Sequence, residues 1–375
     1  MDVPFLVLVV IITALAFDFT NGFHDTANAM ATSIATGALK PKVAVGISAV
    51  LNLVGAFLSV EVAKTISSGI VDEAKITPVV IFAGLVGAIV WNLVTWLLGL
   101  PSSSSHALFG GLIGATWIAA GGDAVHFAAV VQKVLIPALA SPLVAGVVAL
   151  VGTFIVYRVT ERARQDVVGK TFKTGQVLSA SLVSLAHGTN DAQKTMGVIT
   201  LTLISSGTLA AGSGPPIWVV LCAGTAIALG TYLGGWRIIQ TMGKKLTEIQ
   251  TPQGFAAETS AAAVILASSH LGFALSTTHV CSGGIIGSGV GRKLAEVRWG
   301  VAGKMVIAWA LTLPAAAIVG ALAASISTKG NLGTVLVGVV GVVIAAGIYV
   351  LSKRNPVHPD SISEPEPAVP AAVQV

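Results

Sequence analysis

The chain has few charged residues and few aromatic ones. Asp, Glu, Lys and Arg together make up 10% of its 375 residues and aromatic residues 6%, whereas soluble domains carry about 25% charged residues. The two cysteines, Cys222 and Cys281, lie in apolar stretches, which predicts neither a disulfide framework nor a zinc site. No Lys or Arg precedes Ala14-Leu15-Ala16, so this stretch lacks the basic region of a secretory signal, and we expect the first helix to be retained.

Apolar sequence is what the chain has in abundance. Hydrophobic residues make up 54% of it and the mean hydropathy is +0.87. Apolar runs of about 20 residues, enough to cross a bilayer core of roughly 30 Å, recur along the whole chain. We therefore expect an all-α, multi-pass protein of the cell membrane with about 10–12 transmembrane segments. The predicted segments are 4–35, 43–60, 78–98, 107–121, 126–156, 177–205, 216–236, 256–272, 280–291, 300–328 and 331–351.

Two of these segments, 107–121 and 280–291, are too short to cross comfortably. They are expected to be half-helices or re-entrant hairpins.

Basic residues gather in polar stretches between the apolar runs. The stretch near the middle of the chain, "RVTERARQDVVGKTFKTG" from Arg158, predicts a cytoplasmic linker over 158–176 because basic residues are in excess there. The net charge of +5 is interpreted as this positive-inside bias rather than as a sign of nucleic-acid binding. The stretch 353–375 is rich in Pro, Glu, Ala and Val without a periodic face, and is predicted to be disordered.

Two motifs occur once in each half of the chain. "GFHDTANA" from Gly22 has a counterpart in "GTNDAQKT" from Gly188, and Asp25 matches Asp191. "SSSHALFGGLIG" from Ser103 matches "STTHVCSGGIIG" from Ser276, at nearly the same offset. This order and spacing indicate an internal duplication.

The duplication predicts two transmembrane repeats, 1–157 and 177–352. The first contains five predicted segments, and an odd number would invert the second repeat in the membrane. Inverted repeats are the architecture of secondary transporters, in which the substrate site lies near the midplane where the repeats meet.

The acidic motif places carboxylates and amides where a membrane segment should be most apolar. A charge at the centre of a spanning helix costs about 2.5–3.5 kcal/mol, so Asp25 and Asp191 need partners. Asn28 shares a helical face with Asp25, and Asn190 directly precedes Asp191. Carboxylate and amide oxygens are ligands of hard cations, so these four residues are the candidate cation-coupling site. The alternative is that they only hold helices together, and Lys194 could simply pair with Asp191.

The hydroxyl motif has a different chemistry. A row of hydroxyls precedes a glycine-rich apolar stretch in each half. If a short helix begins there, its free N–H groups and dipole form an anion site to which the hydroxyls add donors. The alternative is that the hydroxyls are ordinary N-caps. The candidate anion-binding residues are Ser103, Ser104, Ser105, Ser276, Thr277 and Thr278.

Three histidines beside these motifs are candidate proton or anion contacts. His106 and His279 occupy matching places after the hydroxyl rows, and His24 directly precedes Asp25. Each ring could instead hydrogen-bond a neighbouring backbone group. His187 flanks the second acidic motif and is a weaker candidate.

The charges of the motif residues indicate which kind of transport the site could support. The two motif pairs supply two carboxylates and no Arg, and the nearby Lys194 has a partner of its own to satisfy. An oxyanion beside two ionised Asp residues in a low-dielectric site needs compensation. Cations should therefore enter with the anion, which predicts a symporter and not an anion channel.

At these motifs the sequence closely resembles the inorganic phosphate transporter (PiT) family. The resemblance rests on "NGFHDTANA", "SLAHGTNDAQK", "GLPSSSSHALFGG", "LSTTHVCSGG" and "AWALTLPAAA", and it extends from about residue 10 to 350. It implies an inverted-repeat transporter, not an enzyme, that carries inorganic phosphate across the membrane with a cation. The substrate comes from this resemblance, because the residues alone indicate only a small anion and a cation.

The first acidic motif departs from the family pattern. Many members read Gly-Ala-Asn-Asp in both halves, whereas here His24 stands before Asp25. The variant resembles the bacterial low-affinity branch, which implies coupling to protons and transport of phosphate as a neutral metal–phosphate complex, for example with Mg²⁺. Sodium coupling remains the alternative. No bound cofactor or resident metal is expected, the partners are phosphate and membrane lipid, and a homo-oligomer is left open.

Other classes of protein would use the same features differently. A symporter of another oxyanion such as sulfate, or of a divalent metal, would need the same charges. An intramembrane hydrolase using Ser105 and His106 is disfavoured, because adjacent side chains on a helix diverge by about 100°. A structural or receptor protein would not need duplicated buried acids.

Overall fold

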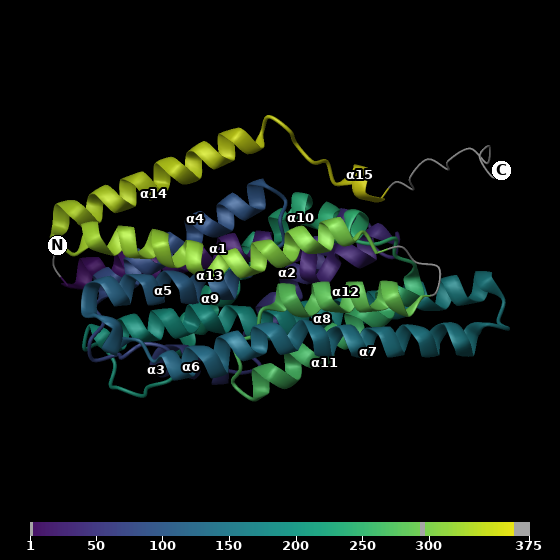
Figure 1. The fold of residues 1–375 in the computed structure, drawn as a ribbon, viewed down its shortest axis with the longest axis horizontal. Coiled ribbons are helices and arrows are strands. Elements are labelled where there is room, and N and C mark those ends of the chain that lie inside the picture. Colours follow the sequence, from purple (N-terminus) through teal and green to yellow (C-terminus); the bar gives the residue numbers. More distant parts are fainter. Residues whose placement is uncertain (1–2, 293–296, 364–375) are drawn as a thin grey trace.

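A computed structural model describes residues 3–292 and 297–363 of the chain, and its secondary structure is almost entirely helical (Figure 1). The described residues contain no strand, only two isolated bridges, Val71–Val125 and Thr247–Val297. The first half contains α1 (Val3–Ala35), α2 (Pro41–Gly55), α3 (Glu61–Gly69), α4 (Pro78–Leu97), α5 (Ser104–Ala120), η1 (Gly122–Ala124), α6 (Phe127–Val130), η2 (Val131–Leu135) and α7 (Ile136–Thr160). The second contains α8 (Gln165–Ser205), α9 (Ile217–Leu233), α10 (Trp236–Gln240), η3 (Thr241–Lys245), α11 (Thr251–His270), α12 (Thr277–Gly291), α13 (Trp299–Ser327), α14 (Asn331–Ser352) and α15 (Asp360–Ser363).

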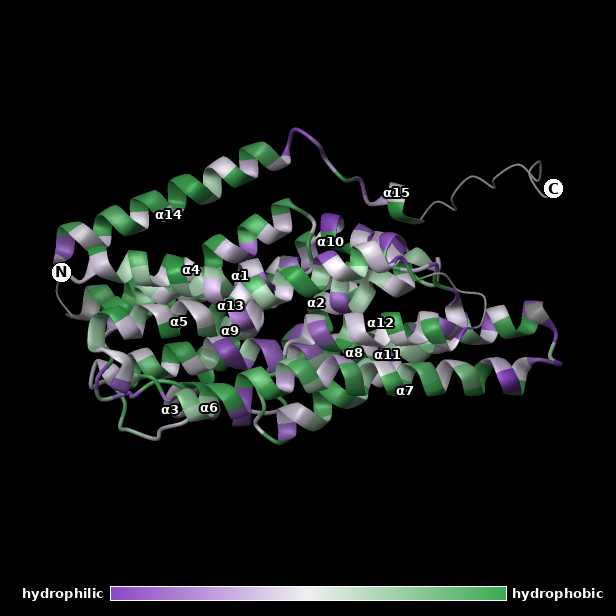
Figure 2. Ribbon diagram, viewed as in Figure 1, coloured by the Kyte–Doolittle hydropathy of each residue, from purple (hydrophilic) through white to green (hydrophobic). Residues whose placement is uncertain are grey.

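Every predicted transmembrane segment falls on a helix. Five described segments are long and apolar enough to cross a membrane alone, or six if α9 is counted with α10 and η3 across their 61° bend. The other predicted segments correspond to the short helices α2, α5 and α12 and to the more polar α8 and α11. Figure 2 shows the outer helix α14 apolar along most of its length. The prediction of an all-α, multi-pass membrane protein is confirmed.

The two halves pack in corresponding ways. In α5, a Cβ added at Gly110 or Gly114 would collide with carbonyl groups of α13, at Leu313 and Ala317. In α12, Gly283 and Gly287 lie equally close to carbonyl groups of α7, at Pro142 and Gly146. These glycines let the short helices approach their neighbours closely. The matching contacts agree with the duplication, whereas the inversion of the second repeat stays a prediction.

The predicted linker is mostly helical. Helix α7 continues to Thr160 and α8 already begins at Gln165, so only 161–164 lies between them. The charges of this stretch pair locally, Arg158 with Glu161 at 2.8 Å and Arg164 with Asp166 at 2.9 Å. This polar sequence contains no proline, and it extends the neighbouring helices in spite of its two glycines.

The first part of the predicted disordered tail packs on the protein. Arg237 donates to the carbonyl oxygens of Ser352 and Asn355 at 2.7 and 2.6 Å. The side chain of Ile362 in α15 is fully buried. Ile362 and Arg237 of α10 thus hold the chain as far as Ser363, which differs from the prediction. The rest of the tail, 364–375, lies outside the described residues.

Candidate functional site

The site forms where the N-termini of the two short helices meet α1 and α8. In Figure 1 α5 and α12 lie on opposite sides of this meeting point. Ser103 and Ser276 are the N-caps of α5 and α12, and each side chain accepts from the backbone N–H of a histidine, His106 or His279, at 3.2 Å. The capping alternative therefore holds for these two serines. Each hydroxyl keeps its own hydrogen, which it can still donate to an anion.

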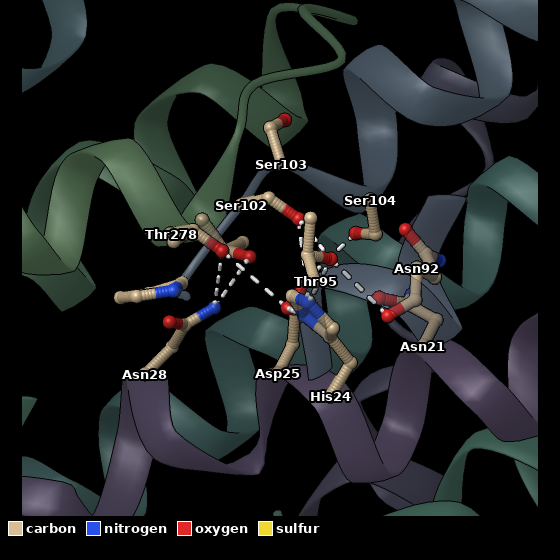
Figure 3. A network of polar contacts seen from close by, with 12 residues as sticks. Asn21, His24, Asp25, Asn28, Asn92, Thr95, Ser102, Ser103, Ser104 and Thr278 are labelled. Carbon is tan, nitrogen blue, oxygen red and sulfur yellow. Dashed lines mark hydrogen bonds and ion pairs between the residues drawn. The ribbon is translucent and has the colours of Figure 1, made fainter. Parts of the chain in front are cut away.

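Asp25 is buried in the C-terminal half of α1 and lies among donors (Figure 3). His24 Nδ1 lies 2.6 Å from its Oδ1, and the Ser104 hydroxyl donates to its Oδ2 at 2.9 Å. Thr278 from the other half donates to Oδ1 at 3.4 Å. The first acid is thus bound by hydroxyls of both short helices.

His24 is oriented by a second pair of hydroxyls. Its Nε2 lies 3.1 Å from Thr95 Oγ1 and 3.3 Å from Ser102 Oγ. With Nδ1 facing a carboxylate, the neutral ring would carry its proton on Nδ1 and accept at Nε2. His24 therefore lies in contact with the first acid, and its role as a proton or anion contact stays a prediction.

Asn28 connects α1 to the second hydroxyl row. Its Nδ2 donates to Thr277 and Thr278 at 3.2 and 3.1 Å. Its Oδ1 is buried without a hydrogen-bond partner among the described residues. The amide therefore has one unused oxygen, of the kind that ligates hard cations.

Asp191, the second acid, is fully buried on α8 and has a cationic partner. Lys194 Nζ lies 2.5 Å from its Oδ1, and His187 Nε2 lies 3.2 Å from its Oδ2. Asn21 and Thr277 donate to Oδ2 at 3.4 and 3.3 Å. The ion pair with Lys194, considered from the sequence as a local role, is formed.

The two acids come together across the halves. One ligand atom from each of Asp25, His187 and Asp191 lies within 4.8 Å of the others, an arrangement that could hold a cation. His187, a weaker candidate in the sequence analysis, joins this cluster because its place four residues before Asp191 puts both on one helical face.

Asn190 lies at the edge of this cluster. Its amide contacts Ser269 of α11 at 2.9 Å in either orientation, and in one of them it also donates to Asp191 at 3.3 Å. Ser105 donates to the carbonyl oxygen of Leu275 at 3.0 Å, so its hydroxyl connects the two hydroxyl loops. Both residues lie beside the site, and neither side chain is hydrogen-bonded to Asp25 among the described residues.

The matching histidines face each other. The rings of His106 and His279 meet edge to face, with centroids 4.9 Å apart, and His279 also lies against Trp309 at 4.2 Å. His279 Nδ1 lies 3.2 Å from the carbonyl oxygen of Ala138. Within the described part of the chain neither ring is hydrogen-bonded to Asp25 or Asp191, which favours the structural alternative for both.

Two buried acids were missed from the sequence. Glu258 on α11 accepts hydrogen bonds from four side chains, at distances from 2.5 to 3.2 Å: Thr32, Ser33, Gln176 and Ser179. Asp18 on α1 is fully buried. Neither belongs to a duplicated motif, and the available signal was the presence of a single acid in an apolar run.

The arrangement can bind an anion together with cations. Three carboxylates, those of Asp18, Asp25 and Asp191, lie on the facing helices α1 and α8, and among the described residues only Lys194 is a permanent cation beside them. Two helix N-termini and their hydroxyls supply donors. An oxyanion in this place would require added positive charge.

Comparisons with known proteins agree with this chemistry. A sequence model described as "Phosphate transporter family" matches residues 21–320. A protein of Mycobacterium bovis named "Probable low-affinity inorganic phosphate transporter" is 57% identical over 96% of this chain and 87% of its own length. A protein of the same name from Bacillus subtilis is 43% identical over 85% of this chain and 96% of its own. A solved structure named "The sodium-dependent phosphate transporter" shares 25% identity with a TM-score of 0.70, covering 84% of this chain and 97% of that one.

Proposed function

Because the chain belongs to the phosphate transporter family, we propose that it is a symporter that imports inorganic phosphate together with cations, chiefly protons. The family is one of transporters, not enzymes, and the chain is a multi-pass membrane protein. The hydrolase alternative also lacks a nucleophile, since Ser105 donates to a backbone carbonyl and His106 faces His279.

The observation that carries the cation coupling is the unequal pairing of the two central acids. Asp191 has the Lys194 ammonium at 2.5 Å, whereas the nearest basic group to Asp25 is the His24 imidazole at 2.6 Å. An imidazole gains and loses a proton near neutral pH. The His24–Asp25 pair can therefore take up one proton and become neutral overall, which lowers the electrostatic cost of admitting phosphate.

Phosphate would bind between the two hydroxyl rows. Ser104 and Thr277 each donate to one of the acids at present, at 2.9 and 3.3 Å. When cations neutralise the acids, these hydroxyls and the free N–H groups of α5 and α12 can turn to the phosphate oxygens. The anion would then be held by equivalent groups of both halves.

Sodium is the second candidate for the coupling ion. It is supported by the structural neighbour, which is named as sodium-dependent, and by the cluster of Asp25, His187 and Asp191. One ligand of that cluster is an imidazole nitrogen, whereas hard cations prefer oxygen ligands. This ligand set favours protons over sodium as the dominant ion. A divalent ion such as Mg²⁺ would enter bound to phosphate.

Uptake of labelled phosphate into proteoliposomes tests the proposal. Proton, sodium and Mg²⁺ gradients are imposed one at a time, with arsenate or sulfate as competitor. We expect proton-driven uptake that arsenate inhibits and sulfate does not. Equal inhibition by sulfate would indicate a general oxyanion carrier, and uptake indifferent to every cation gradient would contradict symport.

A further inference from the structure

Asp18 is a buried carboxylate without a well-formed hydrogen bond among the described residues. It lies in the interior of α1 with an exposed fraction of 0%, and neither of its oxygens is hydrogen-bonded within the described part of the chain. An unpaired buried charge is among the most costly groups in a protein, and more so inside a membrane. Asp18 precedes the region 21–320 that the family match covers, so that match assigns it no role.

Two residues near Asp18 also have an oxygen atom without a hydrogen-bond partner. Asn21 Oδ1 and Thr195 Oγ1 are fully buried and also lack partners among the described residues. Asn21 lies three residues after Asp18, on the same face of α1, and its Nδ2 contacts Asp191 of α8 at 3.4 Å. Thr195 lies four residues after Asp191 on α8, and the Thr195 hydroxyl and the Asn21 amide are near enough to act on the Asp18 carboxylate as weak donors. Three buried side chains that each have an unpartnered oxygen, Asp18, Asn21 and Thr195, thus lie near one another between α1 and α8.

The buried acid Glu258 differs from Asp18 because its carboxylate is hydrogen-bonded. Glu258, also nearly fully buried, is bound by four donors from α1 and α8. Glu258 is therefore satisfied by the protein alone, whereas Asp18 is not. A group left unsatisfied beside other unpaired oxygens requires a positive ligand.

No fixed charge near Asp18 among the described residues is free to neutralise its carboxylate. The charged groups that act on it are Asp191 and Lys194, which pair with each other at 2.5 Å. The helices α4 and α9, which also pack on α1, contain no Asp, Glu, Lys, Arg or His. Neutralisation must therefore come from a mobile ion.

We propose that Asp18, with Asn21 and Thr195, forms a second cation site for one co-transported monovalent cation. It rests on the proposed function and adds a residue that the duplicated motifs do not contain. Seven residues of helix place Asp18 about 10 Å from Asp25 along α1, toward its N-terminus. The ligand is a single positive charge, from a proton on the carboxylate or from a sodium ion among the oxygens. Protons are the source expected here.

The number of cations moved with each phosphate tests this site. In proteoliposomes held at zero membrane potential, phosphate accumulation at equilibrium is measured against an imposed proton or sodium gradient. Each coupled cation multiplies accumulation by the gradient, so Asp18→Asn should lower it about tenfold at a tenfold gradient of the relevant ion. The matched control is Asp123→Asn, which makes the same change at an exposed acid and should leave accumulation unchanged.

The arms of the experiment separate the possible results. A loss confined to the proton gradient assigns the site to protons, and a loss confined to sodium assigns it to sodium. Wild-type accumulation in Asp18→Asn under both gradients would overturn the site while leaving phosphate symport intact. Failure of the wild-type protein to accumulate phosphate would refute the proposed function instead.

A second variant covers the case in which Asp18→Asn does not fold. Thr195→Val keeps the size of the side chain and removes one oxygen, so the cation concentration for half-maximal uptake should rise several-fold. Its control is Thr200→Val on the same helix, because the Thr200 hydroxyl donates to its own helix at Met196. Equal half-maximal concentrations in the two variants would also overturn the site.

Discussion

A carboxylate oxygen of Asp25 and one of Asp191 lie within 4.8 Å of each other, although the two residues come from different halves of the chain. They also share the second hydroxyl row, because Thr278 donates to Asp25 and the adjacent Thr277 to Asp191. A change of charge at one acid therefore alters the electrostatic energy of the other and the hydrogen bonds of the hydroxyls between them.

We expect Asp25→Asn and Asp191→Asn each to abolish concentrative phosphate uptake while the protein still inserts in the membrane. Either amide keeps the shape of the side chain but removes the charge that the coupling cation compensates. Gradient-driven uptake by proteoliposomes is the measurement, and monodisperse elution in detergent checks folding. Normal uptake by one variant would remove that residue from the cation site.

The hydroxyl rows give a second prediction. Replacing Ser104 and Ser105 together, or Thr277 and Thr278 together, by Ala should weaken phosphate binding in both cases, because each row donates to the same anion. The expected loss is at least about tenfold, because one hydrogen bond to a charged group is worth about 1.5–3 kcal/mol. Phosphate binding to the purified variants is measured by calorimetry. Unchanged phosphate affinity in one double variant would show that the hydroxyls of that row only cap the helix N-terminus.

Much of this site could be predicted from the sequence because its chemistry is duplicated. Asp25, Ser103 and their partners recur as motifs, and the recurrence distinguishes a functional polar residue from an accidental one. Duplication does not specify the rotation of each side chain about its helix. The contacts of Asn190, Ser105, His106 and His279 therefore came only from the structure, in which none of them is hydrogen-bonded to Asp25 among the described residues.

What the sequence did not reveal has physical reasons as well. Neither Asp18 nor Glu258 belongs to a duplicated motif. Whether such a single buried acid is hydrogen-bonded depends on donors from other helices. The helical character of the linker over 158–176 was missed because a polar composition was interpreted as a loop. Ile362 is buried by tertiary packing that the composition of the tail does not indicate.

The Lys194–Asp191 pair predicts an effect on stability. Both side chains are fully buried, so Lys194→Met leaves an uncompensated charge, for which the usual cost is about 3–5 kcal/mol. Thermal unfolding in detergent should show a large loss for Lys194→Met and a smaller one when Asp191→Asn is added. If the double variant is as unstable as the single one, the lysine contributes through packing and not through its charge.

The last prediction concerns the driving ion and His24. Its ring lies between the Asp25 carboxylate on one side and the Thr95 and Ser102 hydroxyls on the other. In this position it can hold a proton next to Asp25 while its other nitrogen stays hydrogen-bonded. Uptake should therefore respond to an inward proton gradient, collapse with a protonophore, and persist when choline replaces sodium.

His24→Asn restores the residue that many members of the family have at this position, and it replaces the imidazole by an amide oxygen that can ligate sodium. We expect this variant to lose proton-driven uptake and to gain a dependence on sodium. The competing interpretation is that Asp25, Asn28, Asn190 and Asp191 suffice for sodium and that His24 only packs between helices. Strict sodium dependence of the wild-type protein, without a proton-driven component, would decide for that interpretation, and an unaltered His24→Asn variant would exclude His24 from the coupling step.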